Sequence, residues 1–274
     1  MLRMQHTKRQ ADQKGFTIVE LIVVIVVLGG VFPLLMSLLL GAYTDAFNTA
    51  DRVKSNSEVM QAVWYMDDNI RVASAYNATV PSQFTDAYGP RNNGTAGAEA
   101  WSYKGSASTS RVLITQSYAT SANPLSTSRQ PVFVSSADFD CTTQMYYQPQ
   151  LTFITVYFVK DGTLYRRILT DTTTALCAGN TQQQKKTCPP YITTGRHSSC
   201  EANDEVLATN VTNFSVEYFQ TTQAGSDVPV DPSYTSNDST ILSSADYAKV
   251  TITTSLKGGD VVNTVTQRMT KVNQ

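Results

Sequence analysis

The chain has 274 residues, 41% of them hydrophobic, so it can form a packed core and is not a disordered protein. Its 21 Lys and Arg against 22 Asp and Glu give a formal net charge of −1, which excludes bulk nucleic-acid binding by a basic surface. The charge is unevenly placed, because residues 1–15 carry four basic side chains against a single acidic one, Asp12. Such a basic end is expected on the cytoplasmic side of a membrane.

A long apolar segment follows the basic end. Residues 16–40 contain one charged side chain, Glu20. At about 1.5 Å per residue, a helix of this length crosses a bilayer. A cleaved secretory signal would have a shorter apolar region and small residues at the cut, and Leu40-Gly41-Ala42 is a poor version of such a site. We therefore predict a transmembrane helix over residues 16–41.

Helix-weakening residues gather at one place in this segment. Gly29 and Gly30 lie close to Pro33, which has no N–H to donate to the Gly29 carbonyl. We expect a kink or a melted turn there. Glycine and proline are also ordinary residues of membrane helices, so an undisturbed helix is the alternative.

Glu20 is unusual because an ionisable side chain in a membrane helix is costly unless it has a partner. The alternative is that Glu20 lies near the cytoplasmic edge of the membrane and extends toward the headgroups.

Residues 14–21, KGFTIVEL, together with the short basic leader and the long apolar stretch, resemble the class III signal of type IV pilins and type II secretion pseudopilins. The resemblance implies that a prepilin peptidase cuts after Gly15 and methylates the new amine of Phe16. It also implies that Glu20 attracts that amine on a neighbouring subunit during filament assembly. Such a pairing is physically reasonable, because each charge relieves the cost of placing the other in lipid.

The helical periodicity continues beyond Gly41 and becomes amphipathic. We expect residues 42–75 to form the second half of one long helix and to bury one apolar stripe against a head formed by residues 76–274. The stripe consists of apolar residues at helical spacing: Val59, Ala62, Val63, Met66, Ile70 and Ala73.

The head is predicted to be rich in strands. Residues 151–159 and 163–169 form a hairpin across Asp161-Gly162, because Asp-Gly between two apolar runs is a strong turn signal. Further strands are predicted at 111–116, 211–218, 249–256 and 261–269, and long loops at 76–108, 171–205 and 220–245. The fold class is α+β, with the long helix laid on an antiparallel sheet, and the family resemblance implies the pilin fold.

Three sequence segments outside the leader resemble segments of J-type minor pseudopilins and W-type minor pilins. They are residues 66–73, 156–159 and 162–167. They imply a minor subunit that primes or caps a type IV pilus-like or type II secretion filament. The implied partners are a prepilin peptidase, other major and minor pilins, the inner-membrane platform of the assembly machinery and membrane lipid. The implied location is the inner membrane in a single pass, with the N-terminus cytoplasmic and the head outside, and then an extracellular or periplasmic filament. The alternative is a signal-anchored surface adhesin that binds glycan, DNA or a host surface.

Four cysteines fall in the predicted exported head: Cys141, Cys177, Cys188 and Cys200. An even number in an oxidising compartment favours two disulfides, and the sequence leaves all three connectivities open. The alternative is a zinc site formed by Cys177, Cys188, His197 and Cys200. Structural zinc sites usually have two closely spaced ligand pairs, and only the last two of these residues are closely spaced.

Acidic residues offer oxygen ligands for calcium at Asp227, Asp231 and Asp238, or at residues 203–205. Neither group has the spacing of a known calcium loop, so we predict a solvated acidic loop and no metal. Catalysis finds little support, because the predicted mature chain has one histidine, His197, and no nucleophile-elbow, Walker or dinucleotide motif. We predict that the protein is not an enzyme and holds no cofactor.

Overall fold

The computed structural model describes most of the predicted helix and the strands of the head. The described residues are 15, 17–89, 101–103, 111–122, 126–135, 141, 149–171, 173–190, 192, 194–230, 242, 244–256 and 262–271. The chain divides into two compact units, Met1–Asp51 and Arg52–Gln274. The boundary falls inside the long helix α1 (Ile18–Arg71), and each unit is described by itself.

The first unit contributes the N-terminal part of α1. This part is helical without interruption through Gly29, Gly30 and Pro33, so the predicted melted turn does not form. Pro33 removes only one backbone donor, and the hydrogen bonds of the turns on either side are enough to keep the helix continuous. The side chains of residues 18–51 are exposed.

The second unit contains the end of α1 and eleven described strands. The strands are β1 (Ala73–Asn77), β2 (Leu113–Tyr118), β3 (Thr152–Lys160), β4 (Thr163–Thr170), β5 (Thr187–Cys188), β6 (Ala202–Asn203), β7 (Glu205–Ala208), β8 (Val211–Thr221), β9 (Asp227–Val230), β10 (Tyr247–Ser255) and β11 (Val262–Thr270). They form a five-stranded sheet in the order β1-β2-β3-β4-β7 and a four-stranded sheet in the order β11-β10-β8-β9. Both sheets are antiparallel, whereas β5 and β6 form a separate two-residue parallel pair.

The α+β prediction is confirmed, with corrections in detail. The head contains two main sheets where one was expected. The helix ends at Arg71 instead of near residue 75, because the buried residues Ala73 and Tyr76 belong to β1 and pair with β2. The predicted loop at 220–245 contains β9, which pairs with the far end of β8.

The hairpin predicted across Asp161-Gly162 is confirmed. Both turn residues have positive φ, 50° and 71°, which is the backbone conformation that a two-residue hairpin turn requires. β3 and β4 are paired over eight positions from Lys160–Thr163 outward. This pairing places successive residues of β4 on opposite faces of the five-stranded sheet.

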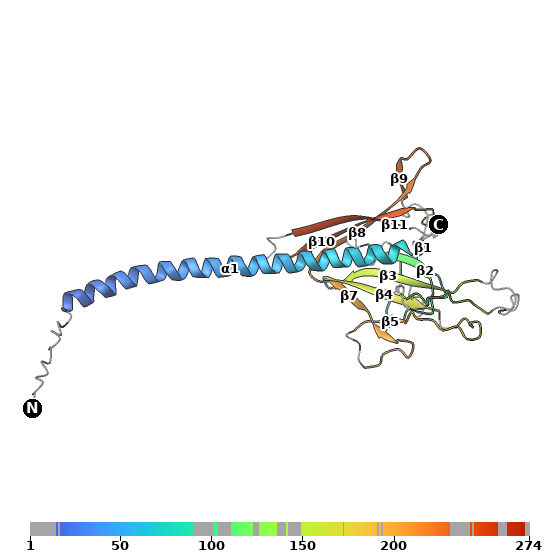
Figure 1. The fold of residues 1–274 in the computed structure, drawn as a ribbon, viewed down its shortest axis with the longest axis horizontal. Coiled ribbons are helices and arrows are strands. Elements are labelled where there is room, and N and C mark those ends of the chain that lie inside the picture. The colour runs from blue at the N-terminus through green and yellow to red at the C-terminus, as the bar shows by residue number, and fades with distance from the viewer. Residues whose placement is uncertain are drawn as a thin grey trace, which may run out of the picture. The chain divides into compact units, whose positions relative to one another are not determined.

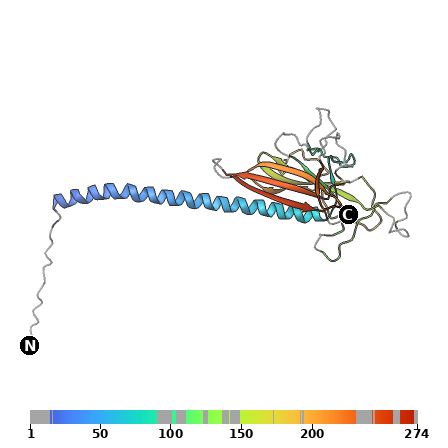
Figure 2. The same ribbon diagram turned by 90° about the horizontal axis from the view of Figure 1, so that it is seen from above.

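The final turns of α1 lie between the two sheets, whose strands run roughly along the helix (Figures 1 and 2). Helix and both sheets share one hydrophobic core. The helix contributes five of the stripe residues predicted above, and the sheets contribute residues such as Leu113 and Tyr157 on one side and Phe214 and Ile252 on the other. The helical stripe is therefore the element that joins the two sheets.

The opposite face of the five-stranded sheet carries a second core. It joins Ile154, Val156 and Phe158 of β3 with Trp101 and Phe84 from the segments that cover this face. The two faces thus have different coverings: α1 and the four-stranded sheet on one, and loop segments on the other.

We expect Met66→Ala to lower the free energy of unfolding by about 2–5 kcal/mol, because Met66 is fully buried in the shared core. Met60 lies on the same helix with 52% of its surface exposed. Met60→Ala should therefore change the free energy of unfolding by less than about 0.5 kcal/mol. Denaturant unfolding of the full chain in detergent, followed by circular dichroism, measures both. Equal effects of the two substitutions would contradict the placement of the helix.

Alkaline pH should destabilise the head. Burial raises the pKa of Tyr76, Tyr157 and Tyr218 above the usual tyrosine value of 10.0. Because the folded pKa exceeds the unfolded one, the stability contributed by these groups is complete below pH 10 and is lost as the pH rises further. Burial lowers the pKa of Lys186 and Lys271. A lowered lysine pKa makes the head more stable as the pH rises, so it opposes the effect of the tyrosines.

The variant Tyr218→Phe keeps the ring and removes one ionising hydroxyl, so comparison with wild type cancels the lysine contribution. Unfolding midpoints measured from pH 8 to 11 should fall less steeply for this variant. Parallel curves would show that the buried hydroxyl does not control the alkaline transition.

Candidate functional site

The N-terminus of α1 is capped by three hydrogen bonds between Thr17 and Glu20. The Glu20 carboxylate accepts from the Thr17 N–H and from the Thr17 hydroxyl, each at 3.2 Å. The Glu20 N–H donates in return to Thr17 Oγ1 at 3.3 Å. This is a capping box, which satisfies backbone donors that the first turn of a helix leaves without partners.

The capping box explains where the helix begins and gives Glu20 a defined place. Glu20 lies in the first turn of α1, where a negative charge is favoured by the helix dipole. The carboxylate is exposed, so it can accept an ammonium group from outside the chain. Gly15 precedes this turn, and a Cβ built at that position meets nothing within 4 Å. Phe16 lies outside the described residues, as do residues 1–14 of the predicted leader.

The segment that follows Glu20 has the properties of a membrane span. α1 is the one helix in the described part of the chain that is long and apolar enough to cross a membrane, judged by length and composition. Its apolar side chains, including Leu21 and Leu40, are exposed. This surface requires an apolar environment, either lipid or other helices.

The four cysteines form two disulfides. Cys141 is bonded to Cys177 and Cys188 to Cys200, so the structure selects one of the three connectivities that the sequence left open. The alternative zinc site is wrong, because its three cysteines are all in disulfides and supply no thiolate ligands. His197 lies instead in an exposed turn, where its Nδ1 is 2.7 Å from Ser199 Oγ.

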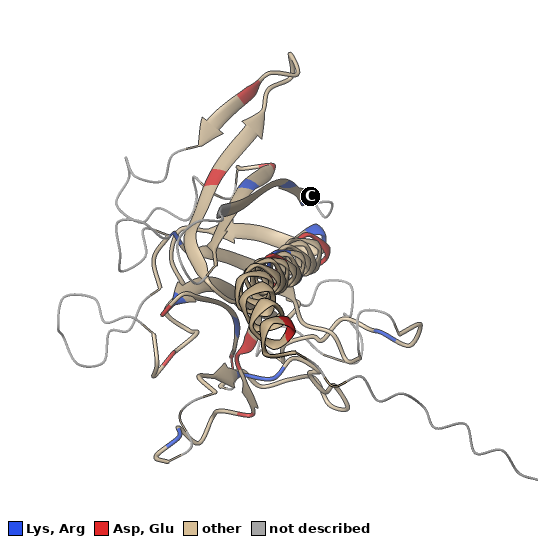
Figure 3. Cartoon of the chain, turned by 90° about the vertical axis from the view of Figure 1, so that its left-hand side faces the viewer, with Lys and Arg blue, Asp and Glu red and all other residues tan. Residues whose placement is uncertain are grey.

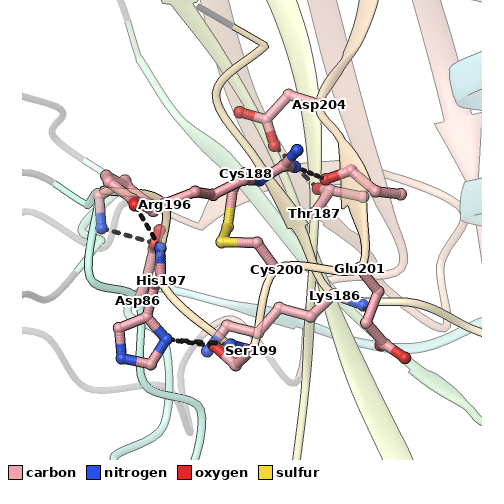
Figure 4. The surroundings of a disulfide bond; sticks show 12 residues. Asp86, Lys186, Thr187, Cys188, Arg196, His197, Ser199, Cys200, Glu201 and Asp204 are labelled. Carbon is pink, nitrogen blue, oxygen red and sulfur yellow. Dashed lines mark hydrogen bonds between the residues drawn. A yellow bond between two sulfur atoms is a disulfide. The ribbon is translucent and has the colours of Figure 1, made fainter. Parts of the chain in front are cut away.

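A buried ionic cluster lies next to the second disulfide (Figure 4). Arg167 of β4 donates to the Asp204 carboxylate from Nε at 3.1 Å and from Nη2 at 2.6 Å. Its Nη1 donates to Asp86 Oδ2 at 2.8 Å, and Trp101 Nε1 donates to the same oxygen at 2.6 Å. The ionic side chains of this cluster are almost fully buried.

Lys186 completes the charge balance of the cluster. Its ammonium donates to the Thr85 carbonyl at 2.5 Å. Burial lowers the pKa of Lys186, while the nearby Asp86 carboxylate acts against that change. The sequence analysis missed this cluster. The signal that could have found it is the pair Arg166-Arg167 inside an apolar strand, where at least one of two successive side chains must face a core.

The acidic residues considered for calcium have other roles in the described structure. Asp204 binds Arg167, and Glu205 forms an ion pair of 3.0 Å with Arg166. Asp227 lies 3.5 Å from Arg268, while Asp231 and Asp238 lie outside the described residues. No group of three metal-binding side chains occurs among the residues that the structure places.

Charged side chains are scattered over the head. In the cartoon of Figure 3, the positions of Lys and Arg and those of Asp and Glu are interspersed along the described chain. This distribution agrees with the near-zero net charge of the chain.

Comparison with protein families matches residues 10–29 to the prokaryotic N-terminal methylation motif. A comparison with curated proteins found no match. The methylation motif, the apolar helix in which it ends and the α+β head are together consistent with a type IV pilin-like protein. The motif implies processing by a prepilin peptidase and assembly with other pilins.

We predict cleavage between Gly15 and Phe16, with one methyl group on the new amine. Mass spectrometry of the N-terminal peptide of the membrane-bound protein measures both. Gly15→Leu should block the cut without disturbing the fold, because position 15 is open. A protein that begins at Met1, or that is cut near Ala42, would contradict this prediction.

Proposed function

We propose that this protein is a minor pilin or pseudopilin that primes or caps a type IV pilus-like or type II secretion filament. The observation that carries the proposal is the methylation motif at the start of a helix that is exposed and apolar in its first half and buried in the head core in its second. A helix of this kind gives a subunit two functions: entry into a helical bundle or membrane, and attachment of a head.

The choice of a minor subunit rests on the head. Two sheets, two disulfides and several long connections make a large head, which is harder to repeat at close spacing along a filament than a compact one. The phrases that resemble minor pilins lie at structurally important places. Residues 66–73 cover the end of α1 and the start of β1, and residues 156–167 cover the β3–β4 hairpin that packs beside it.

The proposed role is structural and not catalytic, and the proposed partners are sister pilins and the inner-membrane assembly platform. The proposed topology places the N-terminus in the cytoplasm and the head outside, where both disulfides can form. Glu20 is proposed to bind the methylated amine of Phe16 on a neighbouring subunit. Its present partner, Thr17, is a neutral side chain, so exchange for a cationic amine is electrostatically favourable.

We expect Glu20→Ala to exclude the subunit from filaments while leaving membrane insertion and head stability unchanged, because the hydrogen bonds of Glu20 among the described residues are made with Thr17 in the first turn of α1. Asp45→Ala is the matched control, since it removes another exposed carboxylate from the same helix. Copurification of the full chain with its sister pilins, measured in membranes, should drop at least about tenfold for the first variant and stay unchanged for the second.

Normal copurification of Glu20→Ala would show that the charge pairing is not needed. Full-length protein that associates with no pilin but binds a glycan or DNA would favour the adhesin alternative. Unprocessed protein in both variants would point to an ordinary membrane anchor.

A further inference from the structure

Two successive arginines in β4 are paired with two successive acidic residues in the β6–β7 segment. Arg166 lies opposite Glu205 in the register of β4 and β7. Arg167 binds Asp204, the residue before Glu205. Because successive side chains of a strand point to opposite faces, the two ion pairs lie on opposite faces of the five-stranded sheet.

The Arg166 pair holds helix α1. Arg166 Nη1 donates to Tyr65 Oη at 2.6 Å and to Glu205 Oε2 at 3.0 Å, and Nη2 donates to Asn69 Oδ1 at 3.3 Å. The guanidinium also lies 5.1 Å from the centre of the Tyr65 ring. Tyr65 and Asn69 are one turn apart on α1, so this arginine fixes the last turns of the helix to β4.

The Arg167 pair is held by the segment next to the disulfide. Thr187 donates to Asp204 Oδ1 at 2.8 Å and accepts from the Ile168 N–H at 2.9 Å, so its hydroxyl connects Asp204 to β4. The Asp204 N–H donates to the Cys188 carbonyl at 2.8 Å. These contacts place Asp204 only while β5 and β6 remain side by side.

The parallel pairing of β5 and β6 is too short to persist alone. It consists of two residue pairs, Thr187 with Ala202 and Cys188 with Asn203. Parallel strands are normally parts of larger sheets, and isolated two-stranded pairs are marginal even when longer. The Cys188–Cys200 disulfide joins this pair across a sequence separation of 12 residues, and Figure 4 shows it beside Thr187 and Asp204.

We propose that the Cys188–Cys200 disulfide controls how firmly helix α1 is held by the head, through the two back-to-back ion pairs. With the disulfide formed, Thr187 holds Asp204 on Arg167, and the neighbouring Glu205 is held on Arg166, which binds α1. With the two cysteines reduced, β5 separates from β6, Asp204 loses its support, and the adjoining Glu205 no longer orients Arg166. The hydrogen bonds of Arg166 with Tyr65 and Asn69 are then weakened, and the last turns of α1 depend more on apolar contacts.

The chemistry of the switch is ordinary thiol–disulfide exchange. Formation removes two protons and two electrons from Cys188 and Cys200 and transfers them to a disulfide oxidant, which becomes a dithiol. Structural disulfides form outside the cytosol. The head therefore tightens on the last turns of α1 only after export.

Hydrogen exchange of the full chain in detergent tests this coupling. Removal of the bond in the double variant Cys188→Ser, Cys200→Ser should speed amide exchange in residues 62–71 of α1 by about tenfold and leave β10 unchanged. The matched control, Cys141→Ser with Cys177→Ser, removes the other disulfide and should leave residues 62–71 at the wild-type rate. Wild-type exchange in α1 after loss of the Cys188–Cys200 bond would overturn the proposal, and so would an equal increase in the control.

A second comparison tests whether the effect of the disulfide passes through Arg166 or reflects a general loosening of the head. In an Arg166→Met background Tyr65 and Asn69 have already lost their hydrogen bonds to β4, so removal of the Cys188–Cys200 bond should produce no further increase at residues 62–71. An increase of the same size as in wild type would show that the coupling does not pass through Arg166.

If the double cysteine variant loses protection throughout the head, Thr187→Val replaces it, because valine keeps the shape of threonine and both disulfides. It should speed exchange at residues 62–71 by about threefold, and an unchanged rate would overturn the proposal. Trp101 fluorescence, measured in a Trp64→Phe background, reports whether the Arg167 cluster itself has opened, since Trp101 donates to Asp86.

Discussion

Everything in this protein depends on one helix that is compatible with two different environments. The first half of α1 is apolar on all sides and is exposed, which suits lipid or a bundle of similar helices. The second half carries one buried apolar stripe, which lies in the core shared by the two sheets. Without residues 59–70 the two sheets would lose the helix that fills their shared core. The apolar half of α1 would then not be attached to a folded head.

Charged residues make up 16% of the chain, and those at the start of α1 differ in exposure from those inside the head. Glu20 is exposed at the start of α1 and is satisfied locally by Thr17, so it remains available to a partner outside the chain. Arg167, Asp86 and Asp204 are almost fully buried and satisfy one another inside the head. Loss of one member of a buried set leaves an uncompensated charge, whereas we expect loss of Glu20 to leave the head intact.

Much of the fold and the N-terminal site could be predicted from the sequence, because their signals are local. The Asp161-Gly162 turn, the apolar segment and the stripe from Val59 to Ile70 each follow from short-range periodicity or turn chemistry. The switch from helix to strand after Arg71 could not be predicted from periodicity, because Ala73 fits the helical stripe and also fits β1. The pairing of the cysteines and of Arg167 with Asp204 depends on contacts between distant segments, which no local pattern encodes.

The proposed assembly requires the start of α1 to contact the start of the same helix in another pilin-like subunit. A photo-crosslinking amino acid at Val19, whose side chain is 70% exposed beside Glu20, tests this contact in membranes that contain the assembled filament. If Glu20 pairs with a neighbouring subunit, we expect crosslinks to the N-terminal helix of a sister pilin, and their loss when Glu20 is replaced by alanine. Crosslinks to lipid alone, or pilin crosslinks that persist without Glu20, would contradict it.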